Sequence, residues 1–131
     1  KDSSKAGIMG YLTSTMDIED FHVLAGSISF FFTGLVCGAV GGVLSLSNSI
    51  PELCCKLYNL YKEGKIEEAK ELHLKLFKVN SNVSGKSAVC GVKAAATICG
   101  YNGGEPRRPL IPLSPQKFDQ LEAYFKQQGL V

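Results

Sequence analysis

The sequence predicts an α/β fold in which a short β-α-β unit precedes a mainly helical C-terminal half. Two observations support this fold class. No charged residue occurs between His22 and Glu52, and amphipathic helical patterns follow from Pro51 onward. Parallel strands that are covered on both faces give near-continuous apolar runs of this kind. The uncharged run is therefore interpreted as strand, helix and strand.

The same run is long enough for a transmembrane helix, which needs about 20 apolar residues. Its composition argues against a membrane span, because serine, asparagine and five glycines interrupt it: Gly26, Gly34, Gly38, Gly41 and Gly42. We therefore favour the buried α/β unit and expect no membrane association. A small membrane protein that uses residues 28–50 is the alternative.

The N-terminal half is divided by glycines and by one acidic segment. A helix is predicted over 6–16, although Gly7 and Gly10 weaken it. Residues 17–20 form an acidic linker. Strands are predicted over 21–25 and 40–46, and a short apolar helix over 29–37 connects them and ends at Gly38.

The C-terminal half contains three or four helices. Ser49-Ile50-Pro51-Glu52 has the spacing of a capping box and predicts a helix that ends at Gly64. An amphipathic helix follows over 65–80, then a turn over 81–87 and an Ala-rich helix over 88–99. A loop rich in glycine and proline covers 102–112, and Ser114-Pro115 begins a last helix that Gly129 ends.

Composition excludes several classes of function. A net charge of +2 is too small to indicate nucleic-acid binding. The five cysteines include no C-x-x-C pair, so we interpret them as small core residues of an intracellular, reducing compartment. His22 and His73 have no neighbouring ligands at metal-binding spacing. No metal and no cofactor is predicted.

Two parallel strands alone make a poor sheet, because each would leave an unpaired edge. The helices after Pro51 also carry apolar faces that need a surface to pack on. We therefore expect strands that precede Lys1 and are absent from this sequence.

Several motifs occur in a characteristic order: Lys1-Asp2-Ser3-Ser4, Asp20-Phe21 through Ser27, Gly38 through Val43, Gly91-Val92-Lys93, Gly100 through Gly104, and Arg108-Pro109-Leu110. In this order the chain resembles the pyruvate-dependent class I aldolases of the dihydrodipicolinate synthase and N-acetylneuraminate lyase family. Within that family it is most similar to the 4-hydroxy-2-oxoglutarate aldolases. The resemblance covers essentially the whole chain.

The resemblance implies a (β/α)8 TIM barrel with an appended helical C-terminal segment. A complete barrel needs about 250 residues, so this chain would be roughly the second half. Residues 1–64 would supply the last βα units, with Lys1 ending strand 6 and strands 7 and 8 at 21–27 and 40–46. Residues 65–131 would form the C-terminal extension, and the N-terminal half would be absent. The resemblance also implies a homotetramer for the full-length protein.

The resemblance also implies the site. Lys1 would be the catalytic lysine that forms a Schiff base with a small 2-oxo acid, which requires a neutral amine. Ser3, Gly26 and Val43 would bind substrate, and glycine at position 26 would let the backbone approach the keto acid. The chain departs from the family at Ser4-Lys5, where Gly-Asp is common. This departure affects a loop or helix start rather than the Schiff base.

The function implied is cleavage of 4-hydroxy-2-oxoglutarate to pyruvate and glyoxylate, in a mitochondrial or cytoplasmic enzyme. The family's catalytic tyrosine and carboxylate-binding loop lie on earlier strands, so we expect the isolated chain to be inactive. A dihydrodipicolinate synthase or a sugar-acid aldolase of the same family is the first alternative. A non-catalytic remnant that binds an intact subunit is the second.

Overall fold

A small parallel sheet lies near the N-terminal end of the structure, a computed structural model that describes residues 1–4 and 7–131. Strand β1 (Leu24–Ala25) pairs in parallel with β2 (Gly41–Gly42), and Asp2 forms an isolated parallel bridge with Ala25. Helix α1 (Gly7–Thr15) connects the first segment to β1. The 3₁₀ helix η1 (Ile28–Phe30) and helix α2 (Phe31–Val36) connect β1 to β2. The predicted helix start at Ala6 lies outside the described residues.

The α/β fold class is confirmed, but both strands are shorter than predicted. The backbone bonds from Val40 N to Val23 O (3.1 Å) and from Val43 N to Ala25 O (2.8 Å) bracket the paired residues. After Leu44 the chain forms the 3₁₀ helix η2 (Ser45–Asn48). Hydroxyl and amide groups there donate to backbone carbonyls three residues earlier, which competes with strand pairing. The predicted strand over 40–46 therefore ends early.

The connection between the strands follows the prediction closely. The Ser27 hydroxyl accepts a hydrogen bond from Ser29 N at 3.2 Å and so caps η1. Gly38 has a φ of 106°, in the left-handed region that favours glycine, and follows Cys37, the C-cap residue of α2. The predicted helix over 29–37 is thus a 3₁₀ turn that continues into a short α-helix.

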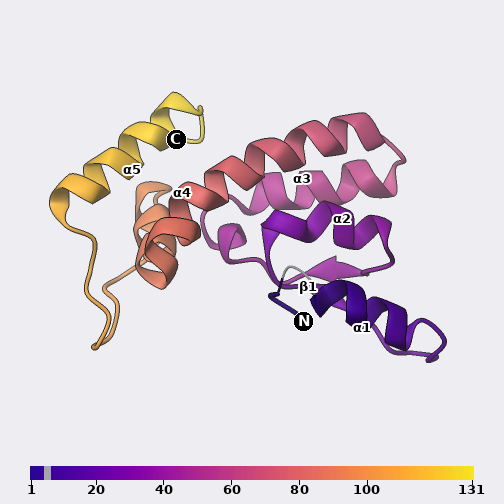
Figure 1. The fold of residues 1–131 in the computed structure, drawn as a ribbon. Coiled ribbons are helices and arrows are strands. Elements are labelled where there is room, and N and C mark those ends of the chain that lie inside the picture. Colours follow the sequence, from indigo (N-terminus) through magenta and orange to yellow (C-terminus); the bar gives the residue numbers. More distant parts are fainter. Residues whose placement is uncertain (5–6) are drawn as a thin grey trace.

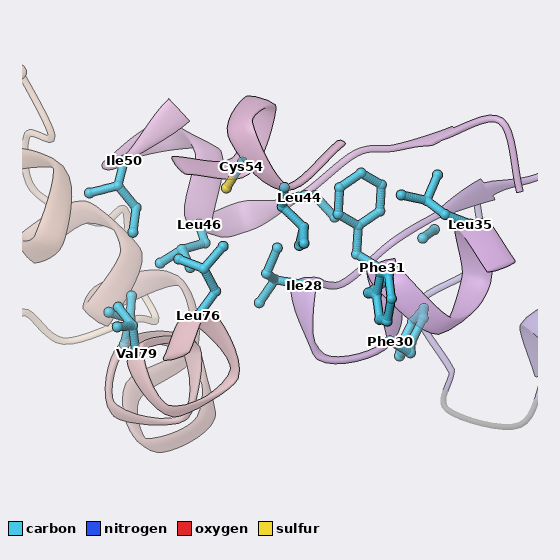
Figure 2. Close-up of a cluster of buried hydrophobic side chains, with 14 of the residues drawn as sticks. Ile28, Phe30, Phe31, Leu35, Leu44, Leu46, Ile50, Cys54, Leu76 and Val79 are labelled. Carbon is cyan, nitrogen blue, oxygen red and sulfur yellow. The ribbon is translucent and has the colours of Figure 1, made fainter. Parts of the chain in front are cut away.

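One hydrophobic core joins the sheet region to the long helices. Figure 2 shows side chains from η1, α2 and η2 meeting those of the following helices, with Leu76 and Val79 opposite Ile28 and Leu46. Leu46, Val79 and Leu76 are fully buried. This core contains residues from both sides of position 64. The division of the chain into residues 1–64 and 65–131 stays a prediction.

Helix α3 (Pro51–Lys62) begins without the predicted capping box. Its N-cap residue is Ile50, and no side chain caps it. The Ser49 hydroxyl instead donates to Leu46 O at 3.0 Å in a buried position. Pro51 occupies the first turn, where its missing N–H costs nothing. The start of the helix was predicted correctly, but the reason was wrong.

Helix α4 (Ile66–Ile98) packs beside α3 and contains one break, at Ala88 (Figure 1). The predicted turn over 81–87 is wrong, because this segment is helical. Its polar residues bond back to carbonyls four residues earlier, as Ser81 does to Phe77 O and Asn82 to Lys78 O. Val83 is fully buried in the same stretch. Burial of this face outweighs the low helix propensity of serine and asparagine.

Ala88 has φ 45° and ψ −132°, a conformation that a residue with a Cβ rarely adopts. Such a residue stores roughly 1–3 kcal/mol of strain. We therefore expect Ala88→Gly to raise the free energy of unfolding by about 1 kcal/mol, measured by urea denaturation. The matched control is Ala123→Gly, at an exposed position inside helix α5 (Pro115–Gln127), which should lower stability by about 0.5–1 kcal/mol. Equal losses in both variants would contradict the strain at Ala88.

The loop after α4 projects from the end of the molecule opposite α1 and leads into α5 (Figure 1). Lys93 is partly buried, and its amine donates to Gly103 O at 2.7 Å. Ser114 caps α5 by accepting from Lys117 N at 3.4 Å, as predicted.

Among the helices described, none is both long enough and apolar enough to cross a membrane.

Candidate active site

The segment that carries Lys1 and Ser3 lies alongside β1. Asp2 N donates to Leu24 O at 3.0 Å, and the bridge between Asp2 and Ala25 is parallel. The bridge places Lys1 and Ser3 on either side of the paired residue. Both side chains are exposed. The carboxyl end of this segment therefore lies beside the carboxyl end of β1.

Lys1, Ser3 and Gly26 form a contiguous group at this end. The Lys1 ammonium nitrogen Nζ donates to Ser3 Oγ at 2.7 Å. A Cβ placed on Gly26 would lie 2.5 Å from Ser3 Oγ and 2.3 Å from the carbonyl oxygen of Asp2. Real Cβ atoms do not approach this closely, so any side chain at position 26 would push the segment of Lys1 and Ser3 away from β1. The protein's own backbone therefore requires glycine here, and the approach of Gly26 to substrate stays a prediction.

Val43 lies at the end of the neighbouring strand. Its backbone N donates to Ala25 O, the residue before Gly26, and its side chain is about half exposed. The four predicted site residues therefore lie at the carboxyl ends of three adjacent parallel segments. Ser3 lies beside both Lys1 and Gly26, and Val43 is one strand away.

Sequence reasoning missed the role of Asp2 and Ser4. The Asp2 carboxylate accepts from Ser4 N at 3.2 Å and from the Ser4 hydroxyl at 2.7 Å. Ser4 Oγ in turn accepts from Gly7 N at 2.9 Å, at the start of α1. These bonds tie the segment of Lys1 to the following helix.

An open cavity of about 290 Å³ adjoins Lys1, lined also by Asp2, Tyr11, Phe21, His22 and Val23. Its aromatic lining is solvent-exposed, with Tyr11 and Phe21 about half accessible. An amine beside a hydroxyl at the rim of a cavity can add to the carbonyl of a small ligand. Across residues 1–4 and 7–131, no three histidine, cysteine or acidic side chains are grouped as metal ligands.

The interpretation of the cysteines as core residues holds only for Cys54. It is buried, and burial, with smaller effects of Cys55 and Glu52, raises the pKa of its thiol to about 12. Cys37 and Cys55 are exposed, and Cys90 and Cys99 are half-buried. Of these four, Cys99 still packs against the edge of the core.

Comparison with known proteins places this arrangement in a family. Residues 5–128 match the Dihydrodipicolinate synthetase family. The 4-hydroxy-tetrahydrodipicolinate synthase of Geotalea uraniireducens is 33% identical over 113 residues, which are 86% of this chain and 39% of that protein. The chain thus spans well under half the length of this relative. The organisms of the relatives give no support to a mitochondrial location.

Two solved structures share the fold. KD(P)GA from T. tenax matches with a TM-score of 0.87 at 26% identity, over 98% of this chain and 45% of that chain. A putative dihydrodipicolinate synthase from Thermus thermophilus matches with a TM-score of 0.80 at 31% identity, over 99% of this chain and 46% of that chain. The chain therefore belongs to the dihydrodipicolinate synthetase family.

Proposed function

We propose that this chain is the C-terminal portion of a Schiff-base aldolase that acts on small 2-oxo acids, with Lys1 as the amine that forms the Schiff base. The contact of Lys1, Ser3 and Gly26 at the carboxyl ends of adjacent parallel segments carries the proposal. Barrel enzymes place their active sites at this end. Membership of a family of class I aldolase-type lyases supports it.

In this proposal the segment at Asp2 ends strand 6 of a barrel, and β1 and β2 are strands 7 and 8. Residues 1–64 supply the last βα units, and residues 65–131 the helical extension. The sheet of the described residues has open edges at the Asp2 segment and at β2, where further strands can pair. The matched share of the solved chains, 45–46%, is consistent with this assignment.

The Lys1 amine would add to the C2 carbonyl of the substrate and lose water to give a protonated imine. The C3–C4 bond then breaks. Its electron pair forms an enamine between C2 and C3, and the C4 hydroxyl loses its proton to become an aldehyde. The enamine takes up a proton at C3, and water releases pyruvate and restores the amine. The hydroxyl of Ser3 holds the amine in place before the attack.

The substrate we propose is 4-hydroxy-2-oxoglutarate, cleaved to pyruvate and glyoxylate, in a homotetramer. A dihydrodipicolinate synthase activity and a sugar-acid aldolase activity are the alternatives within the family. Retro-aldol assays with 4-hydroxy-2-oxoglutarate and with 2-oxo-3-deoxy sugar acids, and condensation assays of pyruvate with aspartate semialdehyde, distinguish them. For the full-length protein, turnover of the first substrate alone is the expected result, whereas the isolated 131-residue chain should show no turnover.

Borohydride trapping with pyruvate tests the Schiff base. We expect a covalent adduct at Lys1 Nζ, which peptide mass spectrometry distinguishes from an adduct on the α-amino group. Lys1→Arg should abolish this adduct, because an arginine side chain forms no stable imine, whereas Lys93→Arg should retain it. No adduct in a folded sample would favour a non-catalytic remnant.

A further inference from the structure

A second cavity, of about 210 Å³, lies between α4 and α5, far from the sheet. It is lined from α4 by Asn82, Lys86 and Ser87, and from the other side by Leu113, Lys117, Gln120, Leu121 and Tyr124. In Figure 1 α5 and β1 lie on opposite sides of the molecule. This cavity, which we call the α4–α5 pocket, is therefore separate from the group around Lys1.

The charge of the α4–α5 pocket is positive. Lys86 and Lys117 contribute two ammonium groups, and no lining residue is acidic. The surrounding sequence strengthens this bias, since residues 72–104 contain four lysines and no aspartate or glutamate. The ion pairs of the described residues involve Lys65, Lys70 and Lys126, so neither pocket lysine is neutralised by a carboxylate.

The pocket also has an apolar wall and one positioned amine. Lys86 Nζ donates to Asn82 Oδ1 at 2.9 Å, which holds this amine at the rim. Leu121 is buried, and Leu113 and Tyr124 are half-buried beside it. A ligand that fits both features has an anionic head and a short hydrocarbon body. Drug-sized ligands need about 300–1,000 Å³, so the volume indicates a smaller molecule.

We propose that the α4–α5 pocket binds a small organic carboxylate. Its head group accepts hydrogen bonds from Lys86 and Lys117, and its hydrocarbon body packs against Leu121 and Tyr124. Charge-assisted hydrogen bonds of ammonium to carboxylate provide the attraction. Exclusion of water from the apolar wall adds to it. The site does not depend on the chemistry at Lys1.

Titration of the 131-residue chain with pentanoate, followed by NMR, tests the proposal. We expect saturable shifts confined to residues of the pocket. Lys86→Gln and Lys117→Gln should each weaken binding by about fivefold, in line with exposed ion pairs. Lys78→Gln, which removes an exposed α4 lysine outside the pocket, should leave the affinity unchanged. Retained circular dichroism spectra would show that the variants fold.

Two further ligands separate the contribution of the negative charge from that of the hydrocarbon body. Pentanamide keeps the hydrocarbon body without the charge, and inorganic phosphate keeps a charge without the body. We expect both to bind more weakly than pentanoate. Equal affinity for pentanamide, equal affinity for phosphate, or an equal loss in Lys78→Gln would each overturn the proposal.

Discussion

Replacing Gly91 by alanine should lower the free energy of unfolding by about 2 kcal/mol, the range of overpacked cores. A Cβ at this position would lie 2.2 Å from the carbonyl oxygen of Val83 and 3.1 Å from the Cβ of Ser87. Val83 is fully buried, so its backbone cannot move aside freely. Gly91 lets the segment of α4 after Ala88 pack directly on the segment before it.

The matched control lies in the same helix. A Cβ on Gly85 would meet Asn80 O at 3.7 Å and Ser81 Cβ at 3.9 Å, both ordinary contacts. Gly85→Ala should therefore raise stability by about 0.5–1 kcal/mol through the higher helix propensity of alanine. Urea denaturation followed by circular dichroism measures both variants. If Gly91→Ala were as stabilising as Gly85→Ala, the close packing of the two α4 segments would be refuted.

The second large expected effect is a loss of stability at acidic pH that depends on His73. This side chain is buried on α4 against the ring of Phe32, with ring centroids 5.8 Å apart, and its Nδ1 has no hydrogen-bond partner among the described residues. Burial lowers the pKa of His73 below its usual value of 6.5. Helix α2, which supplies Phe32, contains no ionisable residue, and burial is the cause of the lowered pKa of His73.

Because the folded pKa is lowered, the unfolded chain takes up a proton that the folded chain resists. The stability that the neutral His73 side chain contributes is fully present above about pH 6.5. It falls as the pH drops below that value, by up to about 1.4 kcal/mol per pH unit, until the folded pKa is reached. Urea denaturation between about pH 7.5 and 5.5 measures this loss.

Two variants isolate the contribution of His73. His73→Leu should remove most of the loss over this pH range, since no group titrates at that position. His22→Gln changes an exposed histidine and should leave the wild-type pH dependence intact. Identical pH profiles for wild type and His73→Leu would show that this imidazole does not control acid stability.

The sequence was most informative where one local pattern has one physical outcome. Gly38, Gly64, Gly100 and Gly129 all have positive φ and follow helix ends, as their positions predicted. The uncharged run from Val23 to Pro51 indicated a βαβ unit rather than a membrane span, because glycine, serine and asparagine interrupt it. The motif around Lys1 indicated the residues of the candidate site and the family.

Other features depended on contacts between residues distant in sequence. Serine and asparagine over 81–87 predicted a turn, but burial of Val83 keeps this segment helical, and the break falls at Ala88. The sequence predicted glycine at position 26 for an approach to substrate, and the structure adds a second reason, the passage of Asp2 and Ser3 across this glycine. Local patterns determined where elements begin and end and which residues are apolar. Packing decided how far each element extends and which backbones touch, because those contacts join parts of the chain that no local pattern relates.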